Sequence, residues 1–137
     1  MDFILNERLA SSCVDVAQIH GCCILLKNEA QFPWFIIVPE VPQGMEDLHH
    51  LDDRIFTEVM LAVRKISCFI EAYFRPEKLN VACIGNIVRH MHIHVVGRST
   101  DDPAWPGGGW AFNAKRQYGE GELETIVSAA QEFLGKC

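Results

Sequence analysis

Histidine alternates with apolar residues in the run from His90 to Val96, which reads His-Met-His-Ile-His-Val-Val. Successive side chains of a β-strand point to opposite faces, so an extended chain would place His90, His92 and His94 on one face. The apolar residues between them would share the other face and anchor it in a core. The run therefore predicts a strand over residues 88–97 that carries imidazoles on one side.

The length and composition restrict the chain to a few classes of protein. Its 137 residues suit one domain over residues 1–137, and 49% hydrophobic with 22% charged residues is ordinary for a soluble globular protein. No apolar stretch approaches the roughly 18 residues that a membrane-spanning helix needs. The first residues lack the basic start and apolar core of a secretion signal. We therefore expect a cytoplasmic protein with no membrane partner.

The net charge argues against a nucleic-acid-binding protein, and the cysteine spacing argues against a thiolate zinc site. A net charge of −6 argues against broad nucleic-acid binding, which depends on a basic surface. A small anionic ligand is compatible with this charge, and Arg89 and Arg98 flank the histidine run as candidate sources of local positive charge. The six cysteines include no Cys-x-x-Cys pair, so a thiolate zinc site is not expected.

The periodicity of the chain predicts strands and helices in a mixed order. Apolar residues at steps of three and four predict a long helix over residues 55–73, with Asp52 or Asp53 capping its start and Arg75-Pro76 ending it. Gly85-Asn86 suggests that the two strands beside it pair as a hairpin, through a two-residue link or a longer loop. The remaining segments are a helix at 2–12, strands at 14–20, 22–27, 34–39, 79–84 and 88–97, a loop at 99–110 and a helix at 123–134. This order predicts an α+β fold, with helices packed on an antiparallel sheet of about five strands.

Three interpretations of the histidine run are open on its residues alone. Two neighbouring imidazoles can share a zinc ion at about 2.0–2.1 Å per bond, but a third from the same straight strand reaches that ion with difficulty. A neutral imidazole is also available at pH 7 to attack phosphorus, provided that its other ring nitrogen is protonated and held. The third interpretation is an exposed histidine-rich face without chemistry.

The run matches the signature of the histidine triad family, in which three histidines alternate with apolar residues and a further apolar residue follows. The match extends to other segments of the chain. Leu26-Lys27-Asn28 and the apolar strand that ends at Val38-Pro39 resemble the nucleotide-contacting region of the family. Gly85-Asn86 resembles its Gly-Gln approach to the triad, and Trp105-Pro106 resembles a Trp-Pro element of its nucleotide-binding branch. The resemblance covers residues 22–107, so we expect a core at about 1–107 and a C-terminal helical extension at about 119–135.

The resemblance implies a nucleotide hydrolase or nucleotidyl transferase that cleaves at the α-phosphate of a purine nucleotide or nucleotide conjugate. By matching position, His92 is the nucleophile that carries the nucleotidyl group, and His90 orients the catalytic network. His94 contacts the scissile phosphate or assists the leaving group. Asn28 is expected to contact the nucleotide and Asn86 its phosphates, although both also suit plain turns. The alternative function is a purine nucleotide-binding module with little or no turnover.

Two departures from the family pattern bear on the substrate. The family often carries Gly-His before its third strand, where this chain has Phe32-Pro33-Trp34, so a supporting histidine is missing. Ile87 occupies a place where several members have a serine or threonine that helps to protonate an amine leaving group. Its absence weakens a phosphoramidase assignment and leaves cleavage of diadenosine polyphosphates open.

The remaining expectations concern metals and partners. We expect no metal or cofactor held by the protein itself, with magnesium entering only on a polyphosphate substrate. The resemblance implies a homodimer, and apolar residues off the main stripe of the long helix (Met60, Leu61 and Val63) give a weaker physical reason for one. A C-terminal helix that covers this surface within one chain is the alternative. His20 and the pair His49-His50 are expected to be structural or solvated.

Overall fold

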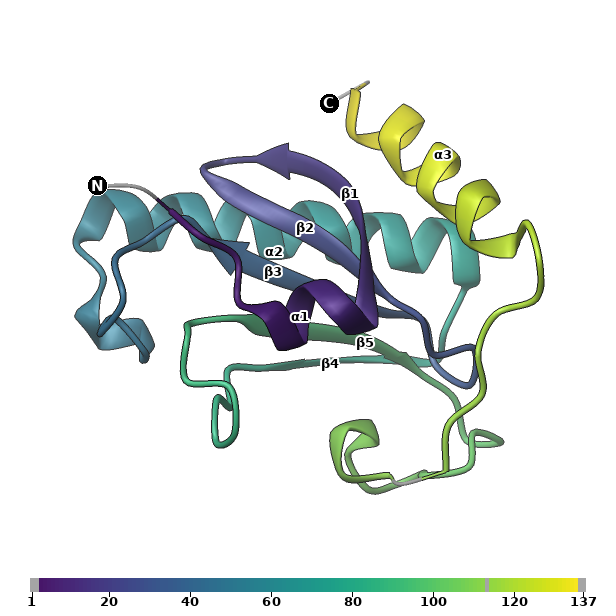
Figure 1. The fold of residues 1–137 in the computed structure, drawn as a ribbon. Coiled ribbons are helices and arrows are strands. Elements are labelled where there is room, and N and C mark those ends of the chain that lie inside the picture. Colours follow the sequence, from purple (N-terminus) through teal and green to yellow (C-terminus); the bar gives the residue numbers. More distant parts are fainter. Residues whose placement is uncertain (1–2, 113, 136–137) are drawn as a thin grey trace.

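The computed structural model describes residues 3–112 and 114–135, and a five-stranded antiparallel sheet forms its centre (Figure 1). The strand order is β1-β2-β3-β5-β4. The strands are β1 (Cys13–Ile19), β2 (Cys22–Lys27), β3 (Trp34–Pro39), β4 (Lys78–Ala82) and β5 (Ile93–Arg98). The helices are α1 (Glu7–Ser12), α2 (Asp53–Phe74) and α3 (Glu122–Gly135), with short 3-10 turns at Leu48–His50 and Gly109–Ala111. The expected α+β class and strand number are confirmed.

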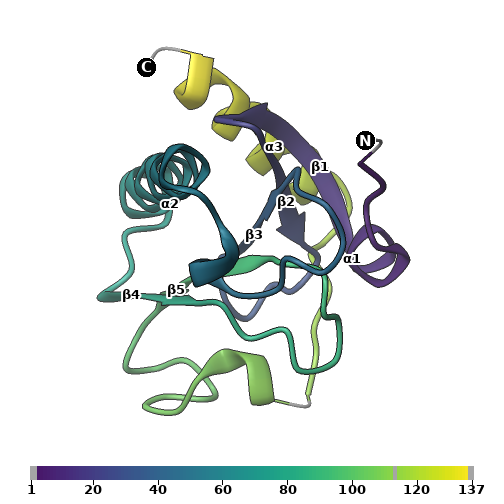
Figure 2. The same ribbon diagram turned by 90° about the vertical axis from the view of Figure 1, so that its left-hand side faces the viewer.

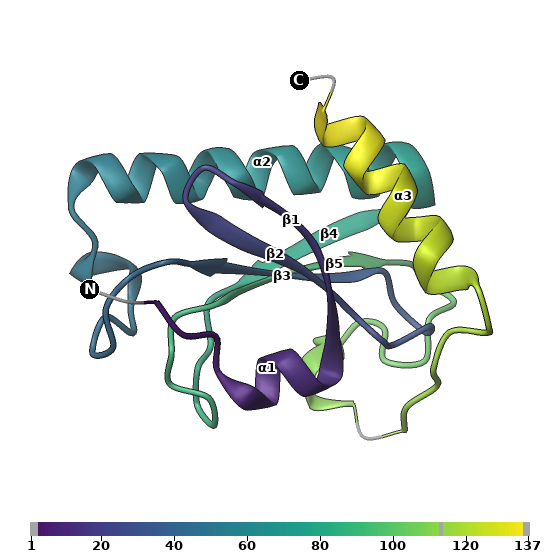
Figure 3. The same cartoon turned by 45° about the horizontal axis from the view of Figure 1, so that its top comes forward.

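Helices α2 and α3 cover one face of the sheet, as Figures 1 and 3 show. The buried side chains of α2, among them Ile66 and Phe69, join one apolar cluster with Met91, Ile93 and Val95. The apolar side of the histidine run is therefore anchored in the core, as its alternation predicts. α3 contributes Ile126, Ala130 and Leu134 to the same cluster.

The ends of α2 carry the signals that the sequence predicts. The Asp52 carboxylate accepts a hydrogen bond from the Ile55 amide at 2.8 Å, which satisfies one of the free N–H groups of the first turn. Arg75 closes the helix in the left-handed conformation, and its amide donates to the Glu71 carbonyl. None of the helices in the described part of the chain is both long and apolar enough to cross a membrane.

The opposite face of the sheet is covered by α1 and by loops, and Figure 2 shows α1 on the other side of the sheet from α2. A second buried cluster forms there, with Leu9 of α1 packed near Trp34, Ile36 and Val96 of the sheet. The partly buried Val88 and Phe112 close over it from two different loops. This loop-covered face carries the histidines.

The histidine strand is shorter than its sequence pattern predicts. β5 begins at Ile93 rather than residue 88, so His90 and His92 precede the strand. The register of β3 with β5 pairs Ile37 with Ile93, which would bring Pro39 opposite residue 91. Proline has no amide hydrogen to extend the ladder, which accounts for the strand ending there.

The two strands that flank Gly85-Asn86 do pair as expected, but through the longer loop rather than a two-residue link. Ala82 pairs with His94, so the connection between β4 and β5 runs over residues 83–92. Gly85 lies in this loop at φ 66°, and a β-carbon there would approach the Val88 carbonyl oxygen to 3.3 Å. A residue without a side chain is therefore favoured at this position.

The expected N-terminal helix is shorter as well. α1 begins at Glu7 because the Asn6 side chain caps it, accepting a hydrogen bond from the Arg8 amide at 2.9 Å. The predicted start at Asp2 lies outside the described residues.

Candidate active site

His92 and His94 lie side by side where the chain enters β5. Their ring centroids are 4.9 Å apart and their planes are 74° from parallel. The residues are only 5% and 8% exposed, respectively. Burial is the main cause that lowers the pKa of both imidazoles, because a charged ring is poorly solvated there. Both rings are therefore neutral at pH 7.

One ring nitrogen of His92 has its protonation state set by the backbone. His92 Nδ1 lies 2.7 Å from the carbonyl oxygen of His90. A carbonyl only accepts hydrogen bonds, so Nδ1 must carry the proton and donate it. The lone pair of the neutral ring then resides on Nε2, which has no hydrogen-bond partner within residues 3–112 and 114–135. This is the tautomer that a nucleophilic imidazole needs.

His94 is held in the opposite tautomer. The indole Nε1 of Trp34 donates to His94 Nδ1 at 3.0 Å, and an indole nitrogen has no lone pair to accept with. Nδ1 of His94 is therefore unprotonated and Nε2 carries the hydrogen. Burial and the nearby charges of His92 and Lys27 lower the pKa of His94 to about 4. His94 consequently presents a neutral N–H donor beside the free lone pair of His92.

The His90 ring is placed differently from the other two. It packs edge-on against Phe3 at 5.4 Å between ring centroids. Burial lowers its pKa, with a smaller opposing effect from a hydrogen bond to the Pro39 backbone. Its Nε2 is buried without a hydrogen-bond partner among the described residues. The contact of His90 with the histidine pair is made by its backbone carbonyl, which orients His92.

Two further side chains, to which the sequence pattern assigns no role of their own, lie near the histidine pair. Lys27, at the end of β2, places its ammonium 4.4 Å from the centre of a Trp34 ring. Trp110 lies with its ring 6.3 Å from that of His94. Trp34 contacts both Lys27 and His94. It stands in the segment Phe32-Pro33-Trp34, which replaces the Gly-His of the family pattern, and this replacement is the signal in the sequence for its contact with the triad.

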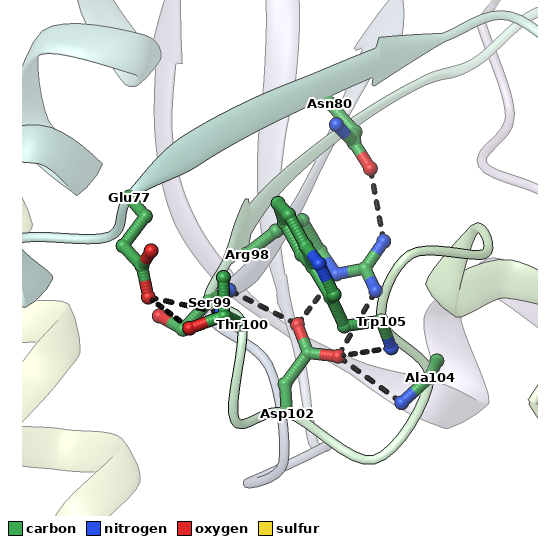
Figure 4. Close-up of polar contacts among 8 residues, drawn as sticks. All are labelled: Glu77, Asn80, Arg98, Ser99, Thr100, Asp102, Ala104 and Trp105. Atoms are coloured by element: carbon green, nitrogen blue, oxygen red, sulfur yellow. Dashed lines mark hydrogen bonds and ion pairs between the residues drawn. The ribbon is translucent and has the colours of Figure 1, made fainter.

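Arg98 does not supply positive charge to the histidines. It is 1% exposed, and its guanidinium donates to both oxygens of Asp102 at 2.7 and 3.0 Å and to Asn80 at 2.9 Å (Figure 4). Burial raises the pKa of Asp102, but the hydrogen bonds from Arg98 and from backbone amides outweigh it and lower that pKa to about 2. The carboxylate also accepts from the Ala104 and Trp105 amides. This network shapes the turn that follows β5.

Arg89 and Asn86 lie away from this arrangement. Arg89 is exposed and forms an ion pair with Glu46 at 2.8 Å. Asn86 is exposed in the loop between β4 and β5, next to Ile87, which is 78% exposed.

Asn28 has its side-chain oxygen occupied within the protein. That oxygen accepts a hydrogen bond from the Tyr118 amide at 2.9 Å, which ties the end of β2 to the chain before α3. Trp105 is 38% exposed, and its ring lies 5.8 Å from the Arg98 guanidinium carbon. Trp110, rather than Trp105, is the tryptophan of this loop whose ring is in contact with a histidine.

Metal-ligating side chains come close together at a different place. In the described part of the chain, Asp47, His49 and His50 form the one group whose ligand atoms lie within 4.8 Å of one another. All three are exposed, and His50 Nδ1 accepts hydrogen bonds from the Glu46 and Asp47 amides. The exposure of His49 and His50 agrees with the expected solvated pair, and the two hydrogen bonds show in addition that His50 caps a turn.

Comparisons with known proteins agree with the fold. A family model of the HIT domain matches residues 10–101. A histidine triad protein from Marinobacter aquaeolei VT8 is 30% identical, with a TM-score of 0.91 over 98% of this chain and 97% of that one. A histidine triad (HIT) protein from Sinorhizobium meliloti 1021 is 28% identical, with a TM-score of 0.89 over 95% and 96%. A histidine triad protein from Bradyrhizobium japonicum is 26% identical, with a TM-score of 0.90 over 95% of this chain and 96% of that one. A search of the curated proteins found no match.

Proposed function

Because the chain belongs to the histidine triad (HIT) family, we propose that it binds a purine nucleotide and transfers the nucleotidyl group to His92. The observation that carries this proposal is the hydrogen bond from His92 Nδ1 to the His90 carbonyl. It leaves the lone pair on Nε2, which is the atom that attacks. His90 then acts through its backbone rather than through its ring.

The proposed reaction has two steps. In the first, His92 Nε2 forms a bond to the α-phosphorus while the bond from phosphorus to the leaving group breaks. The phosphorylated ring keeps its Nδ1 proton, and the His90 carbonyl stabilises the positive charge that develops on the ring. In the second, water attacks the phosphorus, neutral His92 departs, and the nucleoside monophosphate and one proton are released.

His94 has the role of a hydrogen-bond donor in this scheme. Its Nδ1 accepts from Trp34, so the neutral ring has one N–H, on Nε2, to direct at a phosphate oxygen. Such a donor stabilises negative charge that grows in the transition state. A neutral imidazole is a very weak acid, so His94 would not protonate a departing group unless it were first charged. Leaving groups that depart as stable anions therefore suit this site better than amines.

The covalent step is tested by replacing His92. We expect His92→Asn to lower kcat by about 10⁴-fold or more, because an essential nucleophile is removed. An acid-quenched reaction of the native protein should yield a nucleotidyl adduct on the His92 peptide in mass spectrometry. His49→Asn, which removes an exposed histidine, is the matched control. Near-native turnover in folded His92→Asn protein would rule out the mechanism.

A second candidate function is nucleotide binding with little turnover. Two differences from the family pattern favour it, because Phe32-Pro33-Trp34 lacks the supporting histidine and Ile87 lacks the hydroxyl that would assist catalysis. The substrate panel that separates the two functions contains an adenosine phosphoramidate, diadenosine polyphosphates and an acyl-adenylate. Binding without turnover of any of the three would identify the binding module.

We also propose that the protein holds no metal at the histidine pair and forms a homodimer. The Nδ1 atoms of His92 and His94 are both occupied by hydrogen bonds, and a metal on Nε2 would occupy the attacking lone pair. Magnesium would arrive on a polyphosphate substrate. Strand β4 ends the sheet, and Val81 on it is half-exposed, which supports pairing of two sheets at this edge. Of the three apolar residues off the main stripe of α2, Met60 and Val63 are partly buried against the chain's own core, so only Leu61 still supports the dimer from this helix.

A further inference from the structure

Lys27 is placed on the loop-covered face of the sheet. Its neighbour two residues earlier, Leu25, is buried in the cluster of that face. Side chains two apart on a strand point to the same side, so Lys27 shares this face with His94. The contact between the Lys27 ammonium and the Trp34 ring, at 4.4 Å, agrees with this placement.

The Lys27 ammonium has no anionic partner at contact distance. No carboxylate in the described residues lies within ion-pair distance of it. The carboxylate two residues away, that of Glu29, instead accepts hydrogen bonds from the Gln31 and Arg116 amides. Burial is the main cause that lowers the pKa of Lys27. A half-buried ammonium of this kind gains from binding an anion, because partial burial has removed part of its hydration.

Trp34 connects this ammonium to the reacting groups. Its ring lies under Lys27, and its Nε1 donates to His94. The positive charge of Lys27 also contributes to the lowered pKa of His92 and His94, so it acts on both rings. Lys27 and His94 therefore lie on one face of the sheet with Trp34 in contact with both, and the His92 ring lies beside that of His94.

The position of Lys27 near the two histidines bears on which leaving groups the site favours. His94 in its neutral form donates a hydrogen bond but does not release a proton readily, so a leaving group must depart with its charge. A phosphate chain departs as a stable anion and gains from a cation placed beside it. An amine departs only after protonation, and the chain has Ile87 where a hydroxyl would assist that step.

We propose that Lys27 binds the phosphate next to the scissile one and thereby selects nucleoside polyphosphates over substrates with an amine leaving group. This assignment rests on the function proposed above. It makes Lys27 a specificity-determining residue for the bond between the α- and β-phosphates. Its ammonium stabilises the oxygen anion that is released when that bond breaks.

The experiment compares Lys27→Met with the native protein on diadenosine tetraphosphate and on adenosine 5′-phosphoramidate. A charge-assisted hydrogen bond predicts a loss of about 10- to 100-fold in kcat/KM on the tetraphosphate. On the phosphoramidate we expect a change of less than about threefold, because that substrate has no β-phosphate. Lys27→Arg, which keeps the charge, should retain more tetraphosphate activity than Lys27→Met. Lys65→Met on α2, which covers the other face, removes the same charge and should change neither rate.

A binding measurement separates this assignment from the proposed chemistry. In protein that carries His92→Asn, the affinity ratio of ADP to AMP should fall about 10-fold or more when Lys27→Met is added. If the native protein cleaves neither substrate, the catalytic proposal fails and this ratio still decides the role of Lys27. Equal losses on both substrates, an unchanged ratio, or no binding of ADP would each overturn the assignment. Lys27→Gln replaces Lys27→Met in the same tests if the methionine variant does not fold.

Discussion

Acid should destabilise this protein through the histidine pair well before its carboxylates protonate. Burial lowers the pKa of His94 from 6.5 to about 4 in the folded chain. Between these values the unfolded chain binds a proton on His94 and the folded chain does not. The free energy of unfolding therefore falls as pH falls through this window. His92 and His90, whose pKa values are also lowered, act in the same direction.

The size of the effect follows from the two pKa values. For His94 alone, moving from pH 7 to pH 4.5 lowers the free energy of unfolding by about 2.5 kcal/mol, given a folded-state pKa of about 4. Domains of this kind are stable by about 5–15 kcal/mol in total, so the loss is easily measured. The pKa of Asp102 is lowered from 3.8 to about 2, so protonation of this carboxylate adds to the loss of stability only when the pH falls below about 3.8.

Urea unfolding followed by circular dichroism, at several pH values between 7 and 4.5, measures this loss. In His94→Gln the amide oxygen can still accept from Trp34, but the residue does not titrate. We expect its stability to depend less on pH than that of the native protein, by about 2 to 3 kcal/mol over this range. His49→Gln, an exposed histidine, is the control. An unchanged pH dependence in His94→Gln would refute the reasoning.

Three other perturbations test separate parts of the structure. Asp102→Asn should cost about 3–5 kcal/mol in urea unfolding, since it leaves the buried Arg98 without its carboxylate, and native-like stability would contradict this role. Gly97→Ala should cost about 1–3 kcal/mol, because its β-carbon would lie 3.1 Å from side-chain atoms of Ile70 and Pro33. In steady-state assays, His90→Asn should retain turnover at least about 10-fold above that of His92→Asn, because any residue at position 90 supplies the backbone carbonyl that orients His92. An equal loss of turnover in the two variants would show that the His90 ring itself is required. Light scattering at micromolar concentration should give about twice the 15.5 kDa of one chain, and a mass near 15.5 kDa would refute the homodimer.

The sequence alone is sufficient to predict the layers of this fold. The alternation through Met91 and Ile93 places apolar side chains on one face, and the three-and-four spacing along α2 supplies the helix that covers them. Asp52 and Arg75-Pro76 mark the ends of that helix. These features depend on local periodicity and on capping, which neighbouring residues determine by themselves.

The sequence also points to the reactive residues, but it misplaces the start of the strand that carries them. The alternating pattern suggests one strand through all three histidines, whereas β5 begins at Ile93. The boundary depends on the partner strand, because Pro39 reaches the position where pairing would continue. A strand boundary that a neighbour sets cannot be determined from the strand's own pattern.

Contacts between distant parts of the chain decide what each site residue can do. Trp34 sets the tautomer of His94 from 60 positions away, and Asn28 is tied to Tyr118 across 90. Arg98, which flanks the histidine run, forms an ion pair with Asp102 and is therefore not a free positive charge. Residue types and local spacing therefore determine which groups are present and how the chain is layered. The tertiary structure decides which groups are occupied and which remain available, because hydrogen bonds and burial depend on what packs alongside.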